Sequence, residues 1–95
     1  MEIKTLKDLK NELKIEISGE GHTFCNLLQQ TLLEDGDVEI AGYDQPHPLF
    51  LTPIIYIRMK GDKSPSKALQ KALTKIRERA IEFSEEFAKS RKSAT

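Results

Sequence analysis

Residues 64–92 read SPSKALQKALTKIRERAIEFSEEFAKSRK and set the dimensions of this 95-residue chain. Ser64 and Pro65 are typical of a helix start, because serine caps the first free amides and proline suits the first helical position. Nothing in the remainder of the segment breaks a helix. The pattern therefore predicts one helix of about 27 residues, roughly 40 Å long at about 1.5 Å per residue.

This helix carries one apolar stripe, whose members follow one another at intervals of 4, 3, 4, 3 and 4 residues: Leu69, Leu73, Ile76, Ala80, Phe83 and Phe87. Such spacing is typical of the seam between paired helices. A compact domain of this length has a diameter of only about 32 Å, so the helix is too long to lie wholly on its own sheet. Phe83 and Phe87 would then form an exposed apolar patch, which usually marks an interface.

A second helix is predicted over residues 22–33, with Thr23 as its N-cap. Its apolar residues fill an arc of roughly 160°, whereas packing on one sheet needs only about 100°. The segment also carries no formal charge. Both features indicate a helix that is covered on more than one side, and together the two helices predict contact with helices of another chain. The alternative is that the sheet curls round and covers both.

The other segments are predicted strands. Leu13, Ile15 and Ile17 alternate with polar residues, as in a half-buried strand, and residues 1–5 repeat the pattern weakly. A hairpin with a turn at 7–11 is therefore expected. Residues 38–43 alternate in the same way, and residues 54–59 are β-branched and aromatic. The two prolines within residues 44–48 predict a loop between these strands.

The resulting order is β-β-α-β-β-α. We predict an α+β fold with an antiparallel or mixed four-stranded sheet, two helices on one face of it, and a long C-terminal helix. Residues 1–95 are expected to form a single dimerisation domain with a polar tail at about residues 90–95.

Composition narrows the class of protein. Lys+Arg and Asp+Glu are both 15, so the formal charges cancel, which argues against generic adhesion to nucleic acid or to an anionic membrane. No apolar segment reaches the roughly 18 to 20 residues of a membrane-spanning helix, and the first residues lack the apolar core of a signal peptide. The single cysteine excludes an internal disulfide and Cys-rich zinc folds. We expect a cytoplasmic protein.

Two residues have the spacing of a reactive pair. His22 and Cys25 lie three apart at a helix start, where the helix dipole lowers the pKa of a thiol. One interpretation is a nucleophile with its base. No general acid, oxyanion donor cluster or glycine-rich phosphate loop accompanies them, and the flanks are apolar. The favoured interpretation is a small buried cysteine beside a histidine that begins the helix.

The remaining groups of soft, acidic and basic residues show weaker signs of a reactive or ligand-binding site. His22, Cys25 and His47 are the only soft metal ligands and show no paired spacing, so we expect neither a metal nor a cofactor. The acidic residues between 34 and 44 do not match a calcium loop and read as a solvated edge. Basic residues outnumber acidic ones from residue 64 onward. We interpret them as a solvated helix face or as steering for an acidic partner, with no direct DNA contact.

Two separated motifs carry a resemblance over nearly the whole chain. Residues 19–28 read GEGHTFCNLL, and residues 38–43 read VEIAGY, followed by Pro46, His47, Pro48 and Leu49. These segments resemble the small alpha-like subunit family of DNA-directed RNA polymerase, archaeal subunit L. Gly21 stands where the family commonly has an acid, and Phe24 where leucine is common. Both departures leave the helix signal intact, although Gly21 weakens the case for an acid's role at that position.

The resemblance implies a non-catalytic assembly subunit that forms a heterodimer with the larger alpha-like RNA polymerase subunit, which is designated D. Subunits N and P and the large catalytic subunits would join that pair afterwards. His22, Thr23 and Asn26 would order the helix start, and Pro46, His47 and Pro48 would shape a loop on the assembly surface. The expected partner contacts are Phe24, Leu27, Leu28, Leu32, Leu69, Leu73, Ile76, Phe83 and Phe87.

Two alternatives from other classes stay open. A self-associating binding module would use the same helices in a homodimer, and sedimentation of the isolated chain as a stable dimer would favour it. A small thiol enzyme would depend on Cys25, and loss of an activity in Cys25→Ser would favour that.

Overall fold

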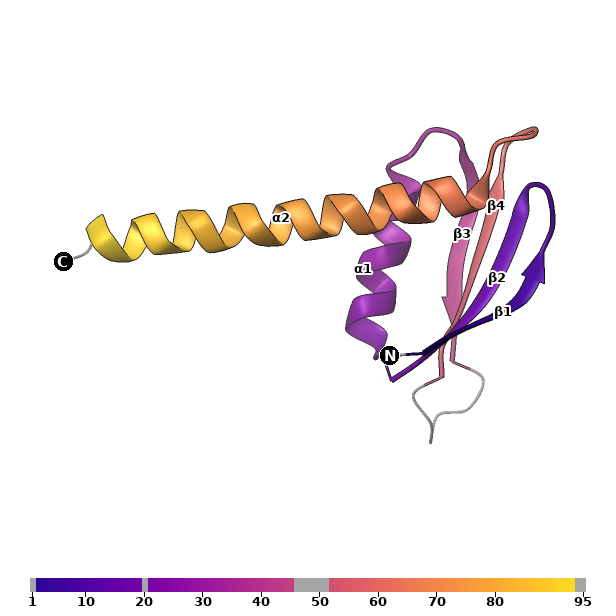
Figure 1. Cartoon of the computed structure of the whole chain (residues 1–95), viewed down its shortest axis with the longest axis horizontal. Coiled ribbons are helices and arrows are strands. Elements are labelled where there is room, and N and C mark those ends of the chain that lie inside the picture. Colours follow the sequence, from indigo (N-terminus) through magenta and orange to yellow (C-terminus); the bar gives the residue numbers. More distant parts are fainter. Residues whose placement is uncertain (1, 20, 46–51, 94–95) are drawn as a thin grey trace.

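The chain forms one antiparallel sheet with two helices against it (Figure 1). The structure is a computed structural model that describes residues 2–19, 21–45 and 52–93. The elements in chain order are β1 (Glu2–Asp8), β2 (Glu12–Ser18), α1 (His22–Leu33), β3 (Val38–Asp44), β4 (Ile54–Met59) and α2 (Pro65–Ser93). The predicted α+β class and the β-β-α-β-β-α order are confirmed. The hairpin turn is shorter than expected, because Lys7 and Asp8 still belong to β1.

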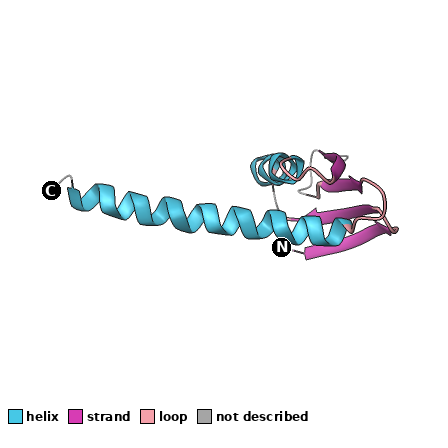
Figure 2. Cartoon of the chain, turned by 90° about the horizontal axis from the view of Figure 1, so that it is seen from above, coloured by secondary structure: helices cyan, strands magenta, loops and turns pink. Residues whose placement is uncertain are grey.

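The strands lie in the order β1-β2-β4-β3, and every neighbouring pair is antiparallel. Alternation along the two central strands decides which face is buried. Leu13, Ile15 and Ile17 of β2 point to the same side as Ile55 and Ile57 of β4, and all five are buried. The helices lie on this face, which we call the inner face (Figure 2).

Helix α1 contributes the other half of the core. Cys25, Leu28 and Leu32 are almost completely buried. Thr31 is buried as well, and its hydroxyl donates to the carbonyl of Leu27 at 2.8 Å, which satisfies that polar group. The prediction that Thr23 caps the helix is wrong: the N-cap is Gly21, with extended backbone and no side-chain cap bond, because the helix already begins at His22.

Two glycines connect β2 and β4 to the helices that follow. Gly19, just after β2, has φ +90°, and Gly61, between β4 and α2, has φ +57°. Such positive φ values are readily adopted by glycine and strain other residues. Ser64 then caps α2 as predicted, with its Oγ 3.4 Å from the amide of Lys67. Helix α2 starts at Pro65, as the sequence indicated.

Helix α2 makes the molecule elongated. Its first turns pack on the sheet through Ala68 and Ala72, and the rest projects beyond it (Figure 1). The molecule measures 53 × 35 × 17 Å, and its radius of gyration is 15.8 Å, well above the roughly 12 Å of a compact domain of this size. The prediction that the helix is too long for its own sheet is confirmed.

Candidate partner-binding surface

An apolar groove opens on the inner face, between the hairpin and the two helices. Its volume is about 260 Å³, and its lining consists only of apolar residues: Ile3, Ile15, Ile17, Phe24, Leu28, Leu69 and Leu73. The groove exists because α1 and α2 cover the centre of the sheet and leave the β1 end bare, so that Ile3 is exposed although it faces the same side as the core. An uncovered groove of this composition fits apolar side chains from another molecule.

The projecting part of α2, residues 77–93, continues this apolar surface, and we call it the arm. Every side chain from Arg77 to Arg91 is exposed. Phe83 is 73% exposed and Phe87 55%. Their rings stack at 6.5 Å between centroids, and the Arg91 guanidinium lies 6.0 Å from the Phe87 ring. This chain's own fold does not supply the favourable free energy of burying these two rings. A partner that covers them would supply it.

An ion-pair cluster joins the base of the arm to the end of α1. The Arg79 guanidinium donates to both carboxylate oxygens of Glu34, at 3.0 and 2.6 Å, and Lys75 Nζ lies 3.7 Å from the same group. The hydrogen bond from Arg79 lowers the pKa of Glu34, and the same bond raises the pKa of Arg79. Glu34 caps the C-terminus of α1, where a carboxylate alone would oppose the helix dipole. The two cations of α2 therefore compensate for it and tie the helices together.

The start of α1 is tied to β3 by a second contact. His22 Nδ1 and the Tyr43 hydroxyl share a hydrogen bond, and the two rings lie 5.4 Å apart. Thr23 and Asn26 are exposed. Of the three residues expected to order the helix start, His22 thus has a visible anchor. Pro46, His47 and Pro48 lie outside the described residues.

The reactive-pair interpretation finds no support in the geometry. Cys25 is fully buried, so a substrate has no access to the thiol, while His22 is bonded to Tyr43. Among residues 2–19, 21–45 and 52–93, no group of three His, Cys, Asp or Glu side chains is placed to hold a metal ion. In the same part of the chain, no helix is both long and apolar enough to cross a membrane.

The predicted partner contacts divide into two groups. Leu28 and Leu32 are each 1% exposed and belong to this chain's own core, so they offer a partner almost no surface, although Leu28 forms the floor of the groove. The others remain accessible or half-buried: Phe24, Leu27, Leu69, Leu73, Ile76, Phe83 and Phe87.

The sequence reasoning missed two exposed apolar residues. Ile81 is 49% exposed, and it escaped notice because it lies about 100° round the helix from Ala80. The wider apolar face that it creates was the available signal. Ile3 was read only as part of a weak strand, and its place in the groove depends on how β1 pairs with β2.

A sheet with an open apolar groove and a helix with half its length uncovered together define a dimerisation domain. The comparisons with known proteins agree. Residues 12–86 match the family described as the RNA polymerase Rpb3/Rpb11 dimerisation domain. The chain belongs to that family.

Individual relatives cover nearly the full length. The chain is 37% identical over 93 residues to the DNA-directed RNA polymerase subunit Rpo11 of Methanocella arvoryzae, a match that spans 98% of this chain and 100% of the relative. It is 45% identical over 76 residues to the subunit Rpo11 of Archaeoglobus fulgidus, or 80% of this chain and 87% of the relative.

The solved structure of DNA-directed RNA polymerase subunit L from Thermoplasma acidophilum superposes with a TM-score of 0.83. The sequence identity is 26%, and the match covers 94% of this chain and 87% of the other. The resemblance drawn from the sequence is confirmed.

Proposed function

We propose that this chain is the small alpha-like assembly subunit of a DNA-directed RNA polymerase and pairs through both helices with the larger alpha-like subunit, the one designated D. One observation carries the proposal: the groove and the arm form one apolar surface that the chain's own fold leaves uncovered. Membership of a dimerisation-domain family supports it. The chain supplies no catalytic group in this proposal, and its role is to hold the partner in place.

The proposed interface has two parts with different tasks. The groove, bounded by Phe24, Leu69 and Leu73, receives apolar side chains of the partner. The arm, with Phe83 and Phe87 and the newly identified Ile81, packs against a helix of the partner. Leu27 of α1 is exposed and Ile76 of α2 is half-buried, so both can contact the partner as well.

Later steps of assembly are proposed from the resemblance. Subunits N and P and the large catalytic subunits join the pair in the cytoplasm. Pro46, His47 and Pro48 shape a loop on the assembly surface, while His22, with Thr23 and Asn26, orders the start of α1. Replacing the three loop residues with alanine should impair polymerase assembly, and unchanged assembly would contradict their role.

The test mixes the purified chain with the purified larger alpha-like subunit and measures the mass of the product by light scattering. A stable one-to-one complex is expected, and Phe83→Asp should abolish it, because the carboxylate would be buried without a counter-charge. Glu85→Ala, on the opposite side of the arm, is the matched control and should pair normally. Sedimentation of the isolated chain as a stable dimer that refuses the larger subunit would contradict the proposal and favour a homodimeric binding module.

A further inference from the structure

Charged residues border the apolar stripe of the arm on both of its sides. At about 100° per residue, those within about 60° of the stripe are Arg77, Arg79, Glu86 and Arg91. Arg79 and Glu86 lie on one side. Arg79 bonds Glu34 at the end of α1, and Glu86 forms an ion pair with Lys89 at 3.5 Å. The charges that border the stripe on this side are therefore compensated within the chain.

The other side of the stripe is bordered by the two remaining arginines, Arg77 and Arg91, which we call the basic edge. They lie about 21 Å apart along the helix at about 1.5 Å per residue. Neither forms an ion pair with any described residue. The arm's other glutamates lie at least about 100° from the nearest stripe residue: Glu78, Glu82 and Glu85. The basic edge is thus the part of this border that lacks a counter-charge among the described residues.

Arg91 lies against a ring that a partner would cover. Its guanidinium is 6.0 Å from the centre of the Phe87 ring, and that ring is 55% exposed. A surface that buries Phe87 therefore also removes water from Arg91. A cation that loses water without gaining a counter-charge carries a large free-energy penalty. A carboxylate beside Phe87 removes this penalty, because its two oxygens match the planar fork of the guanidinium.

A second copy of this chain fits the basic edge poorly. The groove lies at the base of α2 and the arm at its far end, so the arm of one copy reaches the groove of another only when the two arms run antiparallel (Figure 1). A two-fold axis between antiparallel arms sets each edge against the same edge of the other copy. The basic edges would then face each other, and like charges across an interface disfavour the pair.

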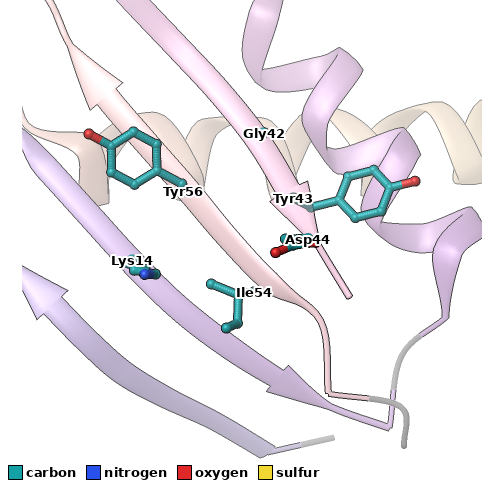
Figure 3. A pocket seen from close by; sticks show the side chains of 6 residues that line it. All are labelled: Lys14, Gly42, Tyr43, Asp44, Ile54 and Tyr56. Carbon is teal, nitrogen blue, oxygen red and sulfur yellow. The ribbon is translucent and has the colours of Figure 1, made fainter. Parts of the chain in front are cut away.

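A hollow on the outer face of the sheet, opposite the helices, shows no such preference. Its volume is about 320 Å³. Its lining comes from β2, β3 and β4 and consists of Lys14, Gly42, Tyr43, Asp44, Ile54 and Tyr56 (Figure 3). Lys14 and Asp44 bring charges of opposite sign to the same hollow, so its charge selects no particular occupant. The basic edge differs because it carries charges of one sign beside an uncovered apolar stripe.

We propose that the arm is covered by a helix with an acidic edge, whose carboxylates pair with Arg91 and Arg77 while its apolar residues pack on Phe83 and Phe87. This inference rests on the proposed function and adds the chemistry of the partner. The larger alpha-like subunit presents this helix, with carboxylates about 21 Å apart along the edge that faces the arginines. The same two arginines select against pairing of identical chains.

The first experiment reverses the charge of the basic edge. Arg91→Glu should weaken binding to the purified larger alpha-like subunit by at least about thirtyfold, as for a covered charge pair, and Arg91→Lys should keep most of the affinity. Arg77→Glu should cost about fivefold, since this residue lies at the rim. Lys71→Glu makes the same change at an exposed position on the side of α2 away from the stripe and is the matched control.

The outcomes separate this inference from the proposed function. Unchanged affinity of Arg91→Glu, or an equal loss in Lys71→Glu, would overturn this inference alone. Failure of the unaltered chain to bind the larger subunit would overturn the proposed function.

The second experiment searches for the carboxylate itself. Each Asp and Glu in the helices of the larger subunit is replaced in turn by lysine, and each variant is mixed with the Arg91→Glu chain. One replacement should restore pairing, because the two reversed charges attract each other again, and rescue by none of them would overturn the inference. Sedimentation of the unaltered chain alone should show a monomer. A stable dimer that still accepts the larger subunit would overturn this inference and leave the proposed function intact.

Discussion

The apolar stripe runs along both halves of α2, but this chain's own core covers part of it only in the first half. In the base, residues 65–76, Leu69 and Ile76 of the stripe pack half-buried against the core, beside the buried Ala68 and Ala72, while Leu73 stays accessible at the groove. In the arm, Phe83 and Phe87 lie in water. The helix is continuous across the boundary, so local propensity does not distinguish the halves. The difference teaches that a periodic apolar stripe indicates burial, but does not say which chain does the burying.

The strongest way to break the comparison is a charge in the core beneath the base. Leu28→Asp buries a carboxylate among apolar side chains and should lower the free energy of unfolding by more than about 4 kcal/mol. Loss of helical circular dichroism at 25 °C is the measurement. Leu27→Asp, at the exposed neighbouring position, should keep the fold and weaken pairing only. Equal damage from both variants would show that the base is not an independent core.

The arm should respond in the reverse way. Phe87→Ala removes an exposed ring, so the melting temperature of the isolated chain should stay nearly unchanged. Affinity for the larger alpha-like subunit should fall by about 2 kcal/mol, or roughly thirtyfold, as for an aromatic anchor at an interface. Titration calorimetry measures the loss, with Glu85→Ala as the control. A variant with full affinity would mean that the stacked rings are not covered by that partner.

A milder change tests the base through its cap. Ser64→Ala removes the side chain whose Oγ faces the Lys67 amide, and the free energy of unfolding should fall by about 1 kcal/mol. Chemical denaturation of the isolated chain measures it. Ser66→Ala, within the first turn, lacks that role and should have little effect. Partner affinity should change in neither variant, because the cap lies at the end of α2 remote from the arm.

The smallest expected effect concerns the boundary between the two halves. The pKa of Glu34 lies below its ordinary value of 4.5 because Arg79 donates to its carboxylate. The ion pair therefore stabilises the folded chain above pH 4.5, and this contribution disappears as the pH falls through the lowered pKa. The melting temperatures of the unaltered chain and Glu34→Gln should converge below pH 4.5. A difference that stays constant down to pH 2 would show that the charge of Glu34 is irrelevant.

Much of the fold could be predicted because each element has its own period. Residues 22–33 form α1 as expected, since apolar positions recur at helical spacing, and the alternation of Leu13, Ile15 and Ile17 matches β2. The exact cap was missed at Thr23, because a glycine with extended backbone can begin a helix without a side-chain bond.

The binding surface could be predicted only in part. The stripe on α2 reveals the arm, whereas the burial of Leu28 and Leu32 depends on how α1 settles on the sheet. The buried face of the sheet depends on β2 lying beside β4, a neighbour distant in sequence. Periodicity within one element contains no information on such pairings.

The strand order also constrains how the polypeptide matures during synthesis. The hairpin must wait for β4 to complete the sheet, because β2 pairs with β4 and not with the elements made in between. Pairings between distant segments form slowly. The arm is synthesised after all four strands, so the strands can begin to pair before its exposed phenylalanines are present. The order of synthesis thereby shortens the time during which the exposed apolar arm is present together with an incomplete sheet.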